Sequence, residues 1–194
     1  ISNYLGFTNF GVSGTLYNTG DGIRMVQEVG ADLWHMDAYE GARVVSASVP
    51  DNMNASAQNI LSGAIFVIDE EGERYFDEGE TPRHGHLKLG DSWVNIRNPL
   101  QPWAICDETV MEKLTASNLI SDINTVYHAD SIEKLATQIN VPAKNLAATV
   151  NDFNSYAVSG NDIKEGRNAS TMAPLSGNEY YAIAMSNNML NTQG

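Results

Sequence analysis

The strongest constraint on the fold of this chain of 194 residues is a pair of helical patterns between residues 130 and 160. In the first, apolar residues recur at the helical spacing behind a capping box of Asp130 and Glu133. Pro142 sets the backbone for a second helix, and Gly160 marks its end. The patterns predict two consecutive helices. The apolar face of the second helix is predicted to contain Leu146, Val150 and Phe153.

Three other regions have the composition of strands. The β-branched run at 42–49 predicts one strand, and 180–185 predicts a last, buried one. Between them, 63–69 and 74–76 are joined by a short acidic turn containing Gly72, which predicts a β-hairpin. Because strands and helices are grouped rather than alternating, the order predicts an α+β domain with a small mixed or antiparallel sheet and packed helices.

Two further helices are expected outside the pair. A tight turn leads into apolar residues at 23–29, with Asp21 or Thr19 as the cap and Gly30 at the end. A shorter helix is predicted to begin after Asp107, whose carboxylate suits an N-cap.

Charge and cysteine content exclude several classes of function. The chain has 24 acidic and 11 basic residues, so it repels phosphate backbones and anionic lipid surfaces. Its apolar runs are too short to span a bilayer, and no signal-peptide pattern is present. The single cysteine, Cys106, lies in an apolar run, which predicts a buried structural thiol rather than a nucleophile.

The chemistry-bearing residues concentrate in one loop. No G-x-S-x-G, H-E-x-x-H, P-loop or G-x-G-x-x-G motif is present. Residues 77–86 instead combine carboxylates with Arg83, His84 and His86 on a chain broken by glycine and proline. Such a loop could bind an anionic or carbonyl-bearing substrate and relay a proton, or it could be a solvated, salt-bridged surface loop. Two histidines alone do not specify a metal site, and no metal is predicted.

Four segments in order resemble a known family. They are the T-G-D-G helix at 18–36, the G-x-R hairpin region at 63–78, the helical pair at 130–154 and the A-P…Y-Y-A block at 173–194. Together they are similar to the FAD-dependent fumarate reductase and succinate dehydrogenase flavoprotein family. That family also includes urocanate reductases, 3-ketosteroid dehydrogenases and L-aspartate oxidases. The resemblance covers nearly the whole chain.

The resemblance implies that the chain is the substrate-capping segment of a larger flavoprotein. Residues 1–42 would form an incomplete edge of the FAD-binding domain, 43–186 the capping domain, and 187–194 the start of the return to the FAD-binding domain. The implied partners are that missing domain, a small unsaturated substrate and an unidentified electron donor. We expect the isolated segment to bind FAD weakly or not at all and to have no turnover.

The resemblance also implies a reaction, in which hydride passes between flavin and one carbon of an activated C=C bond while a protein acid serves the other carbon. Arg83 is the nearest match to the family's arginine acid, offset by one residue, with Glu78 and Glu80 as carboxylate neighbours. The same geometry run in reverse introduces a C=C bond. Substrate contacts are assigned to His84, His86, Asn191 and Thr192, and flavin contacts to Thr19, Gly20, Asp21, Gly22 and Gly194.

Two departures from the family pattern bear on the substrate. The dicarboxylate reductases have a histidine where this chain reads Asp-Ala-Tyr-Glu-Gly-Ala at 37–42, and another where it has Asn191. Losing cationic donors disfavours a dianion such as fumarate. We therefore expect a bulkier or less charged substrate, such as an enone, an enoate, a steroid-like compound or an aromatic acid. The alternative from another class is an acidic α+β binding module without flavin.

Overall fold

The computed structural model describes most of the chain beyond residue 61 and shorter stretches before it. The described residues are 10–12, 17, 19–34, 36, 43–46, 62–79, 86–89, 91–95, 99–120 and 123–189. The chain divides into two compact units. One comprises Ile1–Arg43, Pro82–Asn98 and Asn187–Gly194, and the other comprises Val44–Thr81 and Pro99–Ser186. The assignment of 1–42, 43–186 and 187–194 to parts of a flavoprotein stays a prediction.

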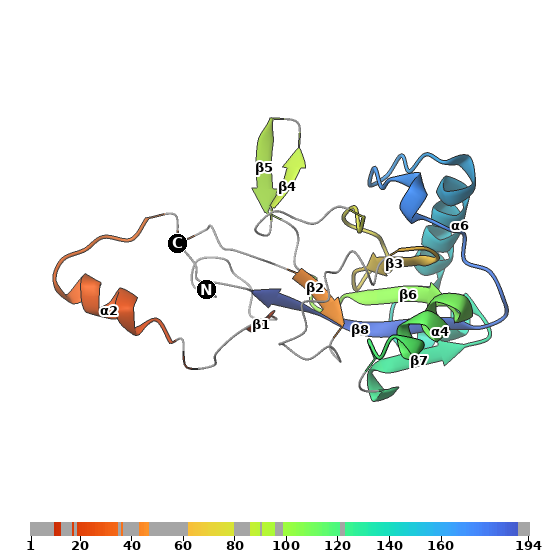
Figure 1. Ribbon diagram of the computed structural model, residues 1–194, viewed down its shortest axis with the longest axis horizontal. Helices are drawn as coiled ribbons and strands as arrows, with labels where there is room; N and C mark the ends of the chain where they lie inside the picture. Colours follow the sequence, from red (N-terminus) through yellow and green to blue (C-terminus); the bar gives the residue numbers. More distant parts are fainter. Residues whose placement is uncertain are drawn as a thin grey trace. The chain divides into compact units, whose positions relative to one another are not determined.

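An antiparallel sheet forms the centre of the second unit (Figure 1). Its strands run in the order β3 (Ile65–Ile68), β6 (Trp103–Asp107), β8 (Tyr180–Met189) and β7 (Val126–Ala129). Every residue of β3 and β6 is buried, and all of them except Asp107 are apolar, so both faces of these strands lie in the core. The register places Phe66 opposite Ile105 and Ile105 opposite Ala182.

The other strands in the described residues pair with β8 or with each other. The far end of β8 pairs in parallel with β1 (Phe10–Val12), and β2 (Arg43–Ser46) also pairs with β8. A separate antiparallel hairpin consists of β4 (His86–Leu89) and β5 (Ser92–Asn95). Sheet pairing is therefore mixed and mainly antiparallel, and the predicted α+β class is confirmed.

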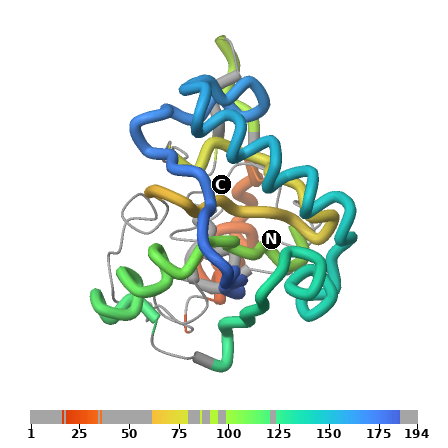
Figure 2. The backbone as a smooth tube through the Cα atoms, turned by 90° about the vertical axis from the view of Figure 1, so that its right-hand side faces the viewer, coloured from red at the N-terminus to blue at the C-terminus, as the bar shows by residue number. Residues whose placement is uncertain are grey.

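In the described part of the second unit, the sheet is covered by the helices α4 (Glu108–Ala116), α5 (Ile132–Gln138) and α6 (Ala143–Ser159). Figure 2 shows the long α6 helix beside β3, and the rings of Phe66 and Phe153 lie 4.7 Å apart between them. As predicted, α6 begins after Pro142 and ends at Gly160, whose φ is +74°. No helix in the described ranges is both long and apolar enough to cross a membrane.

The predicted cap of α4 is also confirmed, whereas that of α5 is wrong by one residue. The Asp107 carboxylate accepts a hydrogen bond from Val110 N at 3.0 Å. At α5 the cap is Ser131, whose hydroxyl accepts from Lys134 N at 3.3 Å. Asp130 instead forms an ion pair with Lys134 Nζ at 2.7 Å. Both residue types can cap a helix, so the sequence alone did not identify which one does.

Helix α2 (Asp21–Glu28) in the first unit has no side-chain cap. Its N-cap is Gly20, with φ +80°, so the prediction of Asp21 or Thr19 as the cap is wrong. Asp21 is the first helical residue and pairs with Arg24 along the helix surface. The turn needs a positive φ at the cap position, which glycine adopts without strain.

The predicted hairpin between 63–69 and 74–76 does not form. The chain does reverse after β3, where the Asp69 carboxylate accepts from Glu71 N at 2.9 Å and Glu73 N at 3.0 Å. The segment at 73–75 nevertheless forms no strand, and β3 pairs with β6 instead. The acidic turn containing Gly72 predicted the reversal, but the outer edge of β3 is taken by other groups.

Candidate functional site

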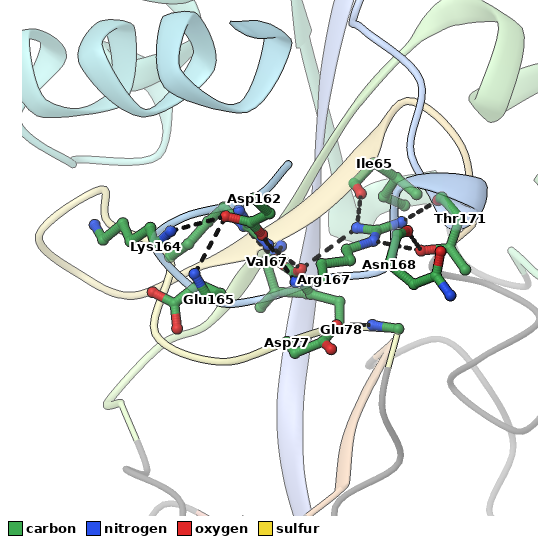
Figure 3. A network of polar contacts seen from close by, with 12 residues as sticks. Ile65, Val67, Asp77, Glu78, Asp162, Lys164, Glu165, Arg167, Asn168 and Thr171 are labelled. Atoms are coloured by element: carbon green, nitrogen blue, oxygen red, sulfur yellow. Dashed lines mark hydrogen bonds and ion pairs between the residues drawn. The ribbon is translucent and has the colours of Figure 1, made fainter. Parts of the chain in front are cut away.

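Side chains occupy the outer edge of β3. This strand is the last in its sheet order, and among the described residues its ladder is with β6. On the other edge, Val67 N donates to Glu78 Oε1 at 3.0 Å, and Arg167 Nη1 donates to Ile65 O at 2.7 Å (Figure 3). An unpaired strand edge exposes backbone donors and acceptors, and here a carboxylate and a guanidinium satisfy them.

Glu78 lies at the centre of this arrangement and is 2% exposed. Its Oε1 accepts from Val67 N and from Arg74 Nε at 2.9 Å. Its Oε2 accepts from Arg74 Nη2 at 2.7 Å and from Arg167 Nη1 at 3.4 Å. A carboxylate offers about four acceptor sites, so all those of Glu78 are in use.

Asp162 is another buried carboxylate of this site, and it organises the loop after α6 (Figure 3). Its Oδ1 accepts from Lys164 N at 3.1 Å and Glu165 N at 3.2 Å. Its Oδ2 accepts from Arg167 N at 3.2 Å and forms an ion pair with Arg74 Nη2 at 2.9 Å. One side chain thus closes the loop on itself and joins it to the segment that follows β3.

Two arginines connect these carboxylates. Arg167 Nη2 donates to Thr171 O at 2.6 Å, and its Nε donates to Thr171 Oγ1 at 3.0 Å. The guanidinium carbons of Arg74 and Arg167 lie 5.3 and 5.6 Å from the ring centroid of Phe153, within cation–π range. We call Arg74, Glu78, Asp162 and Arg167 the buried ion cluster.

The buried ion cluster contains two positive and two negative side chains, so its formal charge is balanced. Burial by itself lowers the pKa of Arg74, but the hydrogen bonds and charges of Glu78 and Asp162 outweigh burial and raise it. Burial raises the pKa of Asp162, and the contacts with Arg74 and with loop amides overcome this and lower it. Burial also lowers the pKa of Arg167, against the opposing charge of Glu78.

The structure describes some of the predicted site residues and not others. Glu78 lies in the buried ion cluster, and His86 is the half-buried first residue of β4. Thr19, Gly20, Asp21 and Gly22 lie at the N-terminal end of α2. Outside the described residues are Glu80, Arg83, His84, Asn191, Thr192 and Gly194. The catalytic, substrate and flavin roles of all these residues stay predictions.

Sequence reasoning missed Asp162 and Arg167. Both fall in the polar stretch from 161 to 177, for which neither a helix nor a strand was predicted. Asp162 and Arg167 lie five residues apart, with Gly166 between them. Solvated loops show the same pattern of an acidic residue, a glycine and a basic residue. The closest signal was Arg74, which belongs to the family-like G-x-R motif and whose buried charge requires partners.

The described residues contain no group of three or more His, Cys, Asp or Glu side chains placed to hold a metal ion. Cys106 is fully buried in β6, as predicted. Burial, with the neighbouring charge of Asp107, raises the pKa of its thiol. The thiol form is therefore favoured over the nucleophilic thiolate.

The chain is similar to several curated oxidoreductases. It is 26% identical over 183 residues to a probable fumarate reductase of Shewanella frigidimarina, a match covering 94% of this chain and 29% of that protein. It is 27% identical over 190 residues to the digoxin reductase of Eggerthella lenta, covering 84% and 32%. It is 27% identical over 163 residues to a 3-oxosteroid 1-dehydrogenase of Mycobacterium tuberculosis, covering 77% and 28%. The chain thus spans about a third of the length of these relatives.

Solved structures show the same fold. A flavocytochrome c3 fumarate reductase in its open conformation matches 98% of this chain and 32% of its own, with a TM-score of 0.66 and 22% identity. A 3-ketosteroid Δ1-dehydrogenase from Sterolibacterium denitrificans matches 93% and 37%, with a TM-score of 0.71 and 20% identity. No protein-family model matches the chain. The resemblance predicted from the four motifs is confirmed.

Proposed function

From its similarity to fumarate reductases and 3-oxosteroid dehydrogenases, we propose that the chain is the substrate-capping segment of an FAD-dependent oxidoreductase acting on CH–CH groups. The observation that carries the proposal is that relatives of both kinds match most of this chain but only about a third of their own length. A capping segment covers the substrate, while the rest of the protein holds the cofactor.

The residues at the start of α2 fit the edge of a flavin. Apart from their chain neighbours and the backbone of α2, no described atom lies within 4 Å of where a Cβ on Gly20 or Gly22 would lie, so a ligand can approach the backbone closely there. A helix N-terminus without a side-chain cap directs amide donors and a partial positive charge outward, which suits electron-rich ligand groups. Thr19, Gly20, Asp21 and Gly22 would hold this edge together with Gly194, and bound FAD would supply hydride chemistry.

The exposed side of α2 supports a missing neighbour. No residue of this helix is buried, and Met25 and Val26 are 67% and 48% exposed. Helices of soluble proteins bury their apolar positions against another element. The FAD-binding domain of the same protein is the proposed cover of these positions.

Proton transfer is assigned to Arg83. In the reductive direction Arg83 donates a proton to one carbon of the activated double bond, while the other carbon receives hydride. Arginine needs a dry site for this role, because its free pKa lies far above neutrality. Glu80 would balance its charge, and His84, His86, Asn191 and Thr192 would contact the substrate.

The expected substrate is an enone, enoate, steroid-like compound or aromatic acid rather than fumarate. The absence of the two family histidines, at 37–42 and at position 191, removes donors suited to a dicarboxylate. Similarity to a digoxin reductase and to 3-oxosteroid dehydrogenases supports a bulkier substrate. The second of these relatives also supports the reverse reaction, in which a C=C bond is introduced.

The test uses the full-length protein, which is expressed with the sequence on both sides of this segment. The reduced enzyme is mixed without oxygen with fumarate, urocanate, cinnamates, enones and unsaturated steroids, and flavin reoxidation is followed. The oxidised enzyme is mixed with the saturated counterparts, and flavin reduction is followed. Arg83→Gln is compared with Arg97→Gln, a matched change at another arginine of the chain.

The proposal predicts that one class of compound reoxidises or reduces the flavin and that Arg83→Gln abolishes this step. The predicted loss is at least about 100-fold, the usual contribution of a positioned acid, while Arg97→Gln keeps most of the rate. Equal rates for Arg83→Gln and the unmodified enzyme would remove Arg83 as the acid. If no compound reoxidises the reduced flavin and none reduces the oxidised flavin, the oxidoreductase assignment is contradicted.

A further inference from the structure

We propose that the outer edge of β3 is a latent pairing surface for a second copy of this chain, and that the buried ion cluster keeps this surface closed. The outer edge is the side of β3 that faces away from β6. Every residue involved lies within the second unit. The proposal goes beyond the proposed function and holds whether or not the protein binds flavin.

The sequence of β3 is typical of a strand that pairs readily. Residues 64–68 are all apolar, with no proline or glycine among them, and three of the five are β-branched. Segments with high β-propensity and without charge or proline are frequent sites of strand pairing between chains. β3 is also the last strand in its sheet order, and proteins close such edges by specific means.

Side chains, rather than a strand, close the middle of this edge. Val67 N donates to Glu78 Oε1 at 3.0 Å. Arg167 Nη1 donates to Ile65 O at 2.7 Å. In a β-ladder the backbone groups of alternate residues point to the same side, so residues 65 and 67 both present their N–H and C=O away from β6. Both bonds belong to the buried ion cluster.

The same row of backbone groups continues at both ends of β3. Gly63 N donates to Thr171 O at 2.9 Å, and Asp69 N donates to Glu73 O at 3.0 Å. These are ordinary backbone contacts with neighbouring loops. The middle of the edge differs from its ends, because there the ion cluster supplies the partners.

The two closed groups are the donor and the acceptor that a second copy of β3 would use. If two identical strands pair antiparallel about a two-fold axis at Phe66, Ile65 of one copy lies opposite Val67 of the other. Residues that face each other at a hydrogen-bonded position exchange both backbone bonds. Val67 N of one copy would then donate to Ile65 O of the other. A two-fold pairing of this kind gives a closed dimer.

The buried ion cluster is well placed to prevent this pairing. Glu78 and Arg167 are each 2% exposed, and Glu78 Oε2 lies 3.4 Å from Arg167 Nη1 beside β3 (Figure 3). A core that needed only packing could use apolar side chains, since buried ion pairs are often replaceable without loss of stability. The bonds to the backbone of β3 give these two charges a further role. A second copy can reach the edge only after both side chains leave it.

Removing both side chains from the edge tests the proposal. Glu78→Met and Arg167→Met are combined in one variant of the 194-residue chain, because methionine fills similar space and makes neither bond. Arg74 and Asp162 remain as a balanced ion pair. Leu135→Ala is the control. Leu135 is fully buried in α5, so its truncation destabilises the fold through a cavity and leaves both bonds at the edge in place.

Sedimentation equilibrium measures the average mass of each chain between about 5 and 200 μM, a range in which exposed strand edges associate. At the upper end we expect the double variant to have about twice the mass of the unmodified chain. Leu135→Ala should keep the mass of the unmodified chain. Adding Val67→Pro to the double variant removes the pairing donor and should restore the lower mass, because strand edges tolerate proline.

Three outcomes would overturn the proposal. The first is a double variant that keeps the mass of the unmodified chain at every concentration. The second is equal association of Leu135→Ala, which would make lost stability the cause. The third is association that Val67→Pro does not reverse, which would locate the contact away from the edge of β3. If circular dichroism shows that the double variant does not fold, Arg167→Lys takes its place, since lysine lacks the planar fork of the guanidinium, and the same comparisons decide.

Discussion

Arg74 Nη2 lies 2.9 Å from Asp162 Oδ2 in the core of the second unit, with side-chain exposures of 2% and 0%. The contact joins the turn after β3 to the loop after α6, two segments that are distant in sequence. Asp162 organises the loop after α6, and Arg74 also binds Glu78 in the segment after β3, so this contact links the two loops. The two loops therefore form one structural unit.

Removing Arg74 should be costly. Arg74→Met leaves Asp162 without its ion-pair partner and leaves Glu78 with Arg167 alone as a charged partner. Breaking a buried ion pair from one side typically costs about 3–5 kcal/mol, so urea unfolding should show a loss of this size. Arg24→Met removes an exposed pair and should change stability by less than about 0.5 kcal/mol. Equal effects of the two substitutions would contradict the described burial of Arg74.

Asp162 should make stability depend on acid pH. Its contacts lower the pKa in the folded protein below the usual 3.8, so it contributes stability above that value. This contribution is lost as pH falls through 3.8 toward the lower, folded-state pKa. Asp162→Asn should be less stable than the unmodified chain near neutrality, and the difference should shrink as pH falls below 3.8. A constant difference between pH 7 and pH 2 would argue against the charged contacts of Asp162.

Two glycines with similar backbones offer a matched comparison. Gly72 and Gly166 have φ of +78° and +77°, but a Cβ at Gly72 would lie 3.2 Å from Leu146 N. A Cβ at Gly166 would have no described atom within 4 Å apart from those of its chain neighbours. Gly166→Ala should cost about 1–2 kcal/mol from the left-handed backbone alone. Gly72→Ala should cost a further 1–3 kcal/mol or so from crowding against α6. Thermal unfolding measures both, and equal losses would contradict the close approach of this turn to α6.

The thiol of Cys106 should be protected in the folded chain. It is buried in β6, and burial raises the pKa of the thiol, so both access and thiolate fraction are low. Labelling by a thiol-reactive reagent should be slow in buffer and should rise with urea in step with unfolding. Free cysteine serves as the control for reagent reactivity. Rapid, complete labelling of the native chain would contradict the placement of Cys106.

Helices were predictable here where the local signals were unambiguous. Pro142 marks the start of α6 because its ring restricts the backbone there. Gly160 marks the end because it adopts a positive φ. The partner of β3 was not predictable in the same way. A reversal at Asp69 leads back along the strand in a hairpin, but the tertiary contacts of Glu78 and Arg167 take that edge instead. Such contacts depend on side chains that are far apart in sequence.

The candidate site was accessible to sequence reasoning only in part. Arg74 and Glu78 belong to a family-like motif, which indicated where the functional loop begins. Asp162 and Arg167 lie in a polar stretch whose composition does not distinguish a buried loop from a solvated one. Their importance follows from burial and from the number of bonds that each makes, which are properties of the folded chain.

The central claim is that this chain caps the substrate of a flavin enzyme, and the flavin content of the full-length protein tests it most directly. The full-length protein, which includes the sequence on both sides of this segment, is purified. Its visible absorption is compared with that of the isolated 194-residue chain. The account predicts stoichiometric FAD in the full-length protein and little or none in the isolated chain. A full-length protein that contains no flavin and binds none when FAD is added would contradict it, and the chain would then be an acidic α+β binding module.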